Sequence, residues 1–490
     1  DLSTATTSFN RFSSVVLTWC AYLSGEDIPP AAKAGIDGAF VMAKALGRDE
    51  EVNQGIARLI DETPPLPVST ADPDAQLTYR LSANLQPHKW TQPHPWTQTF
   101  PGPISMSEPS DITTTIEPSR TGSLALKTYA QPGSVVTVEL PESLIGTGAK
   151  IRVGERYDNL STINTIEVWR RPPLLFRTYP VNATEIHVSN LFGGAVYLVL
   201  DAPLLQPIEI RTRGGLGMLV YTRHASTQAD WDTIQTQLAP QVILEEKGHV
   251  RMVVDTEAAK AVRGPNAVID FWTGFHQHHI DLASEPTPRL FESHWIFDTQ
   301  VGWGYANATP ARLTFPKLAQ VQALRTQTGN EDWWLFGHEL GHQFQTSDWT
   351  GGDVTEVCVN LFTMYTLNHY LNEGGNFQTL GRFEPDAVDH AALRSMRWEN
   401  AGLFEKLDLY RQLIQEFGWI ILQETFASYY DDRYPRMTHG SFMDGFAIRM
   451  SVFSGRDLSE FLSHWNYPMS SNAAARIRGL NLPIWMPIGW

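Results

Sequence analysis

The chain has 490 residues, and its 37 Lys and Arg residues against 53 Asp and Glu residues give a formal net charge of −16. This length is too great for one ordinary domain and predicts two or three, each with its own apolar core. The 16 Trp, 15 Tyr and 23 Phe residues exclude disorder as the main state, because disordered chains are poor in aromatic residues. The acidic balance, without any basic block of five residues, argues against nucleic acid or an anionic membrane as the main partner.

No apolar run approaches the roughly 18 residues that a membrane-crossing helix needs, so we expect no membrane insertion. Cys20 and Cys358 are too few for a disulfide framework and are expected to be two buried thiols. The first residues lack the basic start and apolar stretch of a signal peptide. A low lysine content with many Trp, Thr and Pro residues nevertheless favours an extracellular protein.

Residues 1–64 are predicted to form a small helical domain, because apolar side chains recur at helical spacing from Phe12 to Leu23 and from Val52 to Ile60. A Pro-rich stretch begins at Thr63 and predicts a linker. Residues 65–125 as a whole are rich in Pro, Thr and Ser and are expected to be a linker or an irregular segment.

Residues 126–256 change to a period of two, with short runs of β-branched and aromatic residues separated by turn residues. This pattern predicts an antiparallel β-sandwich. Such a sandwich could bind glycan or support its neighbour, and without a recognisable site the supporting role is favoured. Residues 257–490 show mainly helical patterns, which include amphipathic stretches at 316–328, 332–344, 353–371 and 400–430.

Residues 338–342 read His-Glu-Leu-Gly-His, which is the H-E-x-x-H pattern. Residues four apart share one face of a helix, so His338 and His342 can bind one Zn²⁺ ion through ring nitrogens about 2.0–2.1 Å away. Glu339 would stand beside the zinc-bound water and take its proton as the water attacks a carbonyl group. A chain of this composition contains about 0.02 such patterns by chance, which disfavours a mere pair of surface histidines.

A catalytic zinc needs a third protein ligand, and Glu356 follows two turn-forming glycines at the start of the next predicted helix. Glu356 could instead cap that helix, since it comes three residues after Asp353. Asp348 is a competing ligand, at the position that metzincin-type sites use, but those sites need glycine where this chain has Gln345. Asn360 could hold a ligand imidazole through its outer nitrogen, or make an ordinary hydrogen bond between helices.

The other histidines with suggestive positions are His276, His278, His279 and His369. The first three lack a carboxylate at ligand spacing, and His369 is too far from Glu356 to share its ion. We therefore expect solvent-facing or core imidazoles.

These residues resemble the enhancin-like family of zinc metallopeptidases, the mucin-degrading gluzincins of bacteria and insect viruses. The strongest element is the pattern at 338–342 followed by Glu-Val-Cys-Val-Asn at 356–360. Looser elements include Val-Gly-Trp-Gly-Tyr at 301–305 and the segment at 457–468, so that the resemblance covers roughly residues 126–485. It implies an antiparallel β-sandwich ahead of a mainly helical catalytic domain of the zincin type. Together with the small N-terminal helical region expected from periodicity, this gives an α+β multidomain fold.

The resemblance also implies cleavage of O-glycosylated proteins such as mucins, with one Zn²⁺ per chain. His338, His342 and Glu356 would be the zinc ligands and Glu339 the general base. It further implies a secreted or cell-surface protein of bacterial origin, acting in virulence or in the use of host glycans. The segment after Trp303 departs from the family pattern.

Sugars bind to aromatic rings and fixed polar groups. Candidates near the motifs, each of which could instead be a core or rim residue, are Trp303, Tyr305, Asn307, Trp333 and Arg397. Candidate donors to the oxyanion of the reaction are Tyr429, Tyr430 and His439.

The first functional hypothesis is a secreted zinc endopeptidase that acts on mucin-type glycoproteins. One alternative is a glycan-binding adhesin with a non-catalytic metal site, and another is a general zinc protease or aminopeptidase without glycan dependence. Glu339 argues against the adhesin, because a structural metal site needs no acid between its ligands. No acidic motif dedicated to a free amino terminus is evident, which argues against the aminopeptidase.

Overall fold

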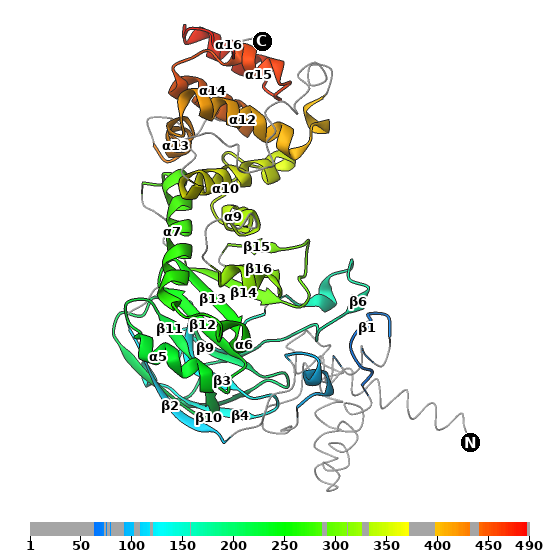
Figure 1. Cartoon of the computed structure of the whole chain (residues 1–490), viewed down its shortest axis with the longest axis vertical. Helices are drawn as coiled ribbons and strands as arrows, with labels where there is room; N and C mark the ends of the chain where they lie inside the picture. Colours follow the sequence, from blue (N-terminus) through cyan, green and yellow to red (C-terminus); the bar gives the residue numbers. More distant parts are fainter. Residues whose placement is uncertain are drawn as a thin grey trace, which may run out of the picture. The chain divides into compact units, whose positions relative to one another are not determined.

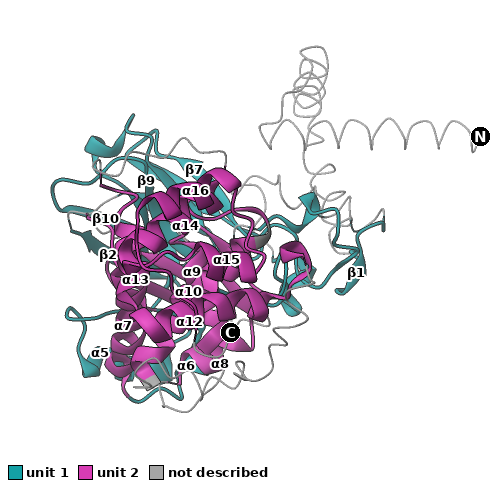
Figure 2. Cartoon of the chain, turned by 90° about the horizontal axis from the view of Figure 1, so that it is seen from above, with its two compact units in different colours: residues 1–243, 253–263, 296–305 teal, residues 244–252, 264–295, 306–490 magenta. Residues whose placement is uncertain are grey.

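The computed structural model describes residues 63–72, 75, 79, 93–101, 108–117, 121–156, 158–286, 292–310, 312–325, 333–371, 397–431 and 441–487 (Figure 1). The predicted N-terminal helical domain lies outside the described residues except for its last two positions, and so does Cys20. The chain divides into two compact units (Figure 2). Unit 1 takes residues 1–243, 253–263 and 296–305, and unit 2 takes residues 244–252, 264–295 and 306–490. The units interleave along the sequence, whereas the predicted domains are continuous, and the predicted boundaries stay predictions.

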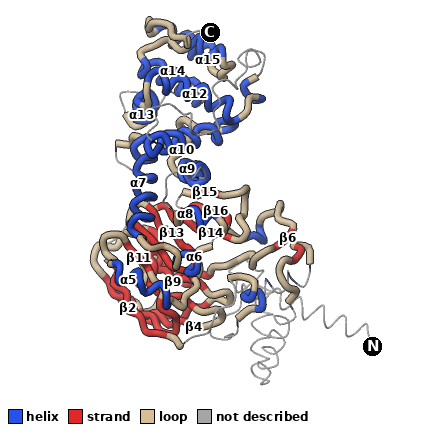
Figure 3. The backbone as a smooth tube through the Cα atoms, viewed as in Figure 1, coloured by secondary structure: helices blue, strands red, loops and turns tan. Residues whose placement is uncertain are grey.

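The main sheet of unit 1 has eight strands in the order β7-β5-β9-β3-β10-β4-β8, with β2 paired to β10 (Figure 3). Its pairings are antiparallel, as the period of two predicts. The strands are β2 (Ser110–Ile116), β3 (Gly122–Ala130), β4 (Val135–Glu139), β5 (Lys150–Val153), β7 (Arg177–Pro180), β8 (Glu185–Ser189), β9 (Gly194–Leu200) and β10 (Ile208–Gly217).

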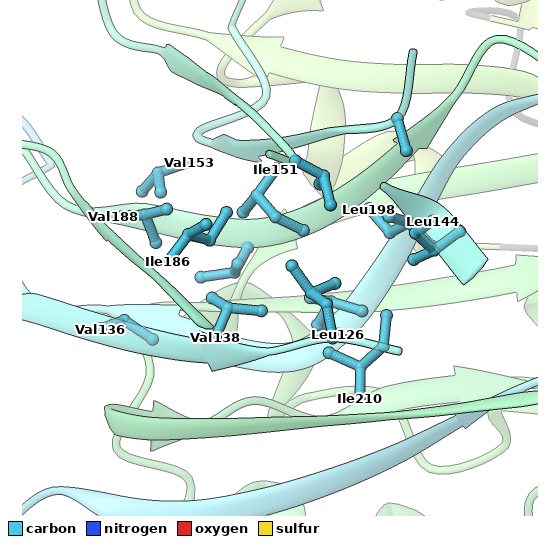
Figure 4. Close-up of a cluster of buried hydrophobic side chains, with 14 of the residues drawn as sticks. Leu126, Val136, Val138, Leu144, Ile151, Val153, Ile186, Val188, Leu198 and Ile210 are labelled. Carbon is cyan, nitrogen blue, oxygen red and sulfur yellow. The ribbon is translucent and has the colours of Figure 1, made fainter. Parts of the chain in front are cut away.

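The core of this sheet is aliphatic (Figure 4). Alternation along β4 buries Val136 and Val138, while Thr137 between them is partly exposed. Ile151 of β5 and Ile210 of β10 are also fully buried in the same cluster, so strands far apart in the sheet order share one core.

A second sheet has the order β11-β12-β13-β14-β16-β15, and a two-stranded sheet pairs β1 (Val68–Ser69) with β6 (Val168–Trp169). The strands of the second sheet are β11 (Val220–Thr222), β12 (Gln241–Glu246), β13 (Val250–Asp255), β14 (Ser293–Asp298), β15 (Asn307–Thr309) and β16 (Arg312–Pro316). The last three strands lie in the part expected to be mainly helical. All six residues of β14 are buried, and a strand buried on both faces shows no alternation by which to recognise it.

Helices form most of the rest of unit 2 (Figures 1 and 3). The longer ones are α7 (Pro265–Ala283), α9 (Trp333–His342), α10 (Thr355–Leu371), α12 (Leu403–Phe417), α13 (Ile420–Ala427), α14 (Phe442–Ser454) and α16 (Ser471–Gly479). Shorter α-helices are α8 (Ala319–Ala323) and α15 (Ser459–His464) in unit 2, and α5 (Gln228–Asp232) and α6 (Thr256–Ala259) in unit 1. The helix expected over 400–430 is divided in two, because Gly418 ends α12 with a φ of 76°.

Antiparallel sheets with helices confirm the expected α+β class. The 3₁₀ turns are η2 (Pro95–Gln98), η3 (Glu142–Leu144), η4 (Leu160–Thr162), η5 (Thr233–Thr236), η6 (Gly352–Val354) and η8 (Trp398–Asn400). None of the helices in the described part of the chain is both long and apolar enough to span a bilayer.

Candidate metal centre

Helices α9 and α10 approach each other closely because α9 presents two glycines to α10. A Cβ atom on Gly341 would lie 2.7 Å from the carbonyl oxygen of Val359, which is closer than real side chains come. A Cβ atom on Gly337 would lie 2.9 Å from Cγ2 of Thr363. The glycines inside the H-E-x-x-H segment therefore permit the helix contact that brings the start of α10 to the two histidines.

Helix α7 fixes the same region of α9 through His279. Its Nε2 lies 3.1 Å from the carbonyl oxygen of Gly337, and its Nδ1 lies 3.0 Å from Oγ1 of Thr366 on α10. Burial lowers the pKa of His279 to about 4, so the ring is neutral at physiological pH. It is a core imidazole that links three helices, in keeping with the sequence analysis.

The side chains of His338, His342 and Glu356 converge, with one potential ligand atom from each within 4.8 Å of the others. Oε2 of Glu356 lies 3.0 Å from Nε2 of His338 and 3.6 Å from Nε2 of His342, and the two Nε2 atoms are 3.3 Å apart. Ligands about 2.0–2.1 Å from a tetrahedral zinc would be about 3.3 Å from one another. The donor set and its spacing therefore fit a zinc ion, and the described residues offer no other group of three such ligands.

The outer nitrogens of both imidazoles are held by amide side chains. Nδ1 of His338 lies 2.9 Å from Oδ1 of Asn360, and Nδ1 of His342 lies 2.8 Å from Oε1 of Gln345. Each ring therefore keeps its Nε2 for the space between the three side chains. The contact of Asn360 with His338 corresponds to one of the two alternatives that the sequence analysis leaves open.

Gln345 was not recognised as a functional residue from the sequence. There it served only as an argument against Asp348, which is not a member of the converging group. A weak signal was available: Gln345 is a hydrogen-bonding residue three positions after His342, and this is the spacing at which side chains of a helix are neighbours.

Glu339 is 6% exposed and follows His338 on α9. Burial, reinforced by the nearby charge of Glu356, raises the pKa of Glu339 to about 7, although His338 opposes the shift. By contrast, the hydrogen bond from His338 lowers the pKa of Glu356. The two carboxyl groups therefore differ chemically: one is a ready anion and ligand, and the other can exchange a proton near neutral pH.

The candidate substrate residues have different environments. Trp333 is 1% exposed and packs against Phe271 and Tyr370, so the expectation that its ring could face a substrate is wrong. Helix α9 is apolar around much of its circumference, and periodicity could not show which face was covered. Asn307 is half-buried on the edge strand β15. Arg397 is exposed and pairs with Glu399 at 3.3 Å.

Trp303 and Tyr305 lie in unit 1, where their side chains are 51% and 73% exposed. Tyr429 is largely buried beneath the guanidinium of Arg449, and within the described structure its hydroxyl makes no hydrogen bond. Tyr430 donates to Glu285 at 3.0 Å. His439 lies outside the described residues. The roles suggested for these residues stay predictions.

Comparison with known proteins gives matches over most of the chain. The Danio rerio TRPM8 channel-associated factor homolog is 23% identical over 376 residues, which cover 73% of this chain and 39% of that protein. The chain thus spans about two fifths of the length of the curated relatives that it matches. A functionally unknown conserved protein from Bacillus anthracis superposes with a TM-score of 0.60 at 17% identity, covering 77% of this chain and 80% of that one.

IMPa from Pseudomonas aeruginosa, solved in complex with an O-glycopeptide, superposes with a TM-score of 0.59 at 16% identity. The match covers 88% of this chain and 58% of that one, and at this identity it establishes a shared fold. Residues 119–211 match the N-terminal domain of M60-like peptidases, and residues 214–466 match the family described as peptidase M60, enhancin and enhancin-like. Because the second match spans more than half of the 490 residues, the chain belongs to the M60 family of enhancin and enhancin-like peptidases.

Proposed function

We propose that this protein is a zinc endopeptidase, secreted or on the cell surface, that hydrolyses peptide bonds of mucin-type O-glycosylated proteins. The observation that carries the proposal is the convergence of His338, His342 and Glu356 beside the buried Glu339, in a chain of the M60 peptidase family. The O-glycopeptide bound to the Pseudomonas aeruginosa neighbour supports the substrate class.

The residues of the site would have separate roles in the reaction. His338 and His342 present their Nε2 atoms, and Glu356 presents a carboxylate oxygen, so these three would hold the ion. Zinc, when bound there, supplies Lewis acidity towards the scissile carbonyl group and acidifies water to a pKa of about 7. Glu339 is close enough to interact with His338 and Glu356 and would accept the proton of the attacking water, then pass it to the leaving amine.

The test is digestion of a defined O-glycopeptide and of its deglycosylated counterpart, read by mass spectrometry. We expect one cleavage beside the glycan-bearing Ser or Thr, none in the bare peptide, and none after treatment with a chelator. Restoration by added Zn²⁺ would identify the metal. Equal cleavage of both peptides would leave a general zinc protease, and cleavage that resists the chelator would overturn the proposal.

A second candidate is a binding protein that hydrolyses nothing. It is favoured by the names of the curated relatives, which state association with a channel. The same digestion separates the two: a binding protein would leave the glycopeptide intact with Zn²⁺ present. The buried Glu339 beside the ligands favours the peptidase.

A further inference from the structure

We infer that Gln345 is a positioning residue of the metal centre, which sets the tautomer of His342 and ties the end of α9 to the first turn of α10. Its Oε1 lies 2.8 Å from Nδ1 of His342. Its Nε2 donates to the carbonyl oxygen of Thr355 at 2.6 Å and to Oγ1 of Thr350 at 3.3 Å. The inference rests on the proposed function only in taking the three converging side chains to be a metal site.

The orientation of the amide follows from its partner on α10. A backbone carbonyl oxygen can only accept a hydrogen bond, so the NH₂ group of Gln345 must face Thr355. The amide oxygen then faces His342 and requires a proton on Nδ1. The neutral ring therefore has its lone pair on Nε2, which is the atom that points towards His338 and Glu356.

His338 has a matching arrangement. Oδ1 of Asn360 lies 2.9 Å from its Nδ1, while Nδ2 of Asn360 donates to the carbonyl oxygen of Glu356 at 2.8 Å. The two amides are thus fixed by consecutive carbonyl groups, those of Thr355 and Glu356, in the turn of α10 that carries the third ligand. Both amides are neutral, so each orients its ring without adding negative charge to the site.

Gln345 differs from Asn360 in its place in the chain. Asn360 is on α10, whereas Gln345 belongs to the connection that follows α9. Gln345 therefore bonds this connection to α10, because its Nε2 donates to the carbonyl oxygen of Thr355, the residue before Glu356. Loss of its amide would loosen His342 and Glu356 together, while loss of the Asn360 amide would act first on His338.

The test measures metal affinity without any substrate. Gln345→Met keeps the length of the side chain and removes both hydrogen-bonding groups, and Gln345→Glu keeps an acceptor for His342 while losing the donor to Thr355. With Zn²⁺ titrated against a chelating dye, we expect Gln345→Met to bind 10–100-fold more weakly than the wild type. Gln345→Glu should recover only part of this loss and bind between Gln345→Met and the wild type, because it restores the acceptor for Nδ1 of His342 but not the hydrogen bond to Thr355. The absorption spectrum of the cobalt-loaded protein should change in Gln345→Met and return towards the wild type in Gln345→Glu.

Gln343 provides a matched control, because it lies two residues away and its amide contacts no proposed ligand. It accepts from Oγ of Ser293 at 2.6 Å and donates to the carbonyl oxygen of Thr309 at 2.9 Å. Gln343→Met should lower the melting temperature and leave Zn²⁺ affinity unchanged. If Gln345→Met binds Zn²⁺ as the wild type does, or if Gln345→Glu is as weak as Gln345→Met, Gln345 does not set the tautomer of His342 and the inference fails.

The outcome is independent of whether the substrate assignment is correct. A wild-type protein that binds Zn²⁺ tightly and cleaves no glycopeptide would refute the proposed function and leave the role of Gln345 standing. A wild-type protein that cleaves the glycopeptide, with Gln345→Met unaltered in Zn²⁺ affinity, would do the reverse.

Discussion

In unit 1 the core of the eight-stranded sheet is made of aliphatic side chains such as Val138, Ile151 and Ile210, all fully buried. In unit 2 the contact between α9 and α10 has glycine at its closest points and hydrogen-bonded amides around it. An aliphatic core depends on volume and on apolar area removed from water, which many side chains can supply. A metal centre depends on atom positions within fractions of an ångström. Changes in the first region should therefore alter stability, and changes in the second should alter chemistry.

The largest expected difference between the two regions is in turnover, and a substitution of Glu339 tests it. Glu339→Gln retains the shape of a side chain that is 6% exposed but cannot accept a proton at neutral pH. Loss of a general base costs about 10²–10⁴-fold in rate, so we expect turnover of the glycopeptide to fall by about that factor. Zn²⁺ content, measured by elemental analysis, and melting temperature should be retained. A variant that keeps full activity would remove Glu339 from the mechanism.

Ile151→Ala, in β5, should lower stability without changing the chemistry of the site. The side chain is fully buried in the aliphatic cluster, and truncation of such a residue costs about 2–5 kcal/mol in unfolding free energy. Urea unfolding should show this loss, while turnover per folded molecule and Zn²⁺ affinity stay as in the wild type. Should Ile151→Ala weaken Zn²⁺ binding as much as stability, the two regions would not be separable in this way.

The sequence predicts the centre of the site better than its surroundings. Helix geometry alone predicts that His338 and His342 lie on one face of a helix. The prediction of Glu356 as the third ligand needed one more assumption, that the next helix packs against the first. Gln345 was missed because its role depends on a carbonyl oxygen of α10, a contact between segments that no local spacing encodes. For Trp333 the sequence left a substrate-facing and a core position open, because the covered face of an apolar helix is decided by its neighbours, here α7 and α10.

The fold shows the same division. Strands such as β4 and β8 of unit 1 were predictable because their residues alternate between buried and more exposed positions. The strands β14 and β16 were not, because almost every residue in them is buried and the alternation disappears. Gly418 ends α12, and a glycine at this position in the sequence is a signal for the end of a helix.

The dependence of stability on pH tests whether buried imidazoles in the two units contribute in the same way. Burial lowers the pKa of His94 in unit 1 to about 3, while the same residue in the unfolded chain titrates near its ordinary value of 6.5. Above pH 6.5 the His94 ring is neutral in both the folded and the unfolded state. Below pH 6.5 the ring binds a proton in the unfolded state but not in the folded state, so stability falls from pH 6.5 towards 3. The slope from one such group is at most about 1.4 kcal/mol per pH unit.

The measurement is urea unfolding at several pH values between 4.5 and 7.5. His94→Asn keeps an acceptor for the backbone N–H of Trp96, which His94 Nδ1 accepts at 3.1 Å, and removes the titrating group. We expect the variant to lose part of the wild-type slope below pH 6.5, whatever its stability at neutral pH. An unchanged slope would mean that His94 binds its proton equally in both states. His279 of unit 2, with a pKa lowered to about 4, should contribute in the same direction.

The smallest expected effect compares the two glycines of α9. Alanine at Gly341 would set its Cβ 2.7 Å from a backbone oxygen of Val359, so the helices must separate, at a cost of about 1–3 kcal/mol. Alanine at Gly337 would meet the side chain of Thr363 at 2.9 Å, and a threonine can change rotamer. Gly341→Ala should therefore be the less stable of the two and should also bind Zn²⁺ more weakly, because α10 carries Glu356. Equal stability and equal Zn²⁺ affinity of the two variants would show that the closeness of the helices at Gly341 does not determine the position of the third ligand.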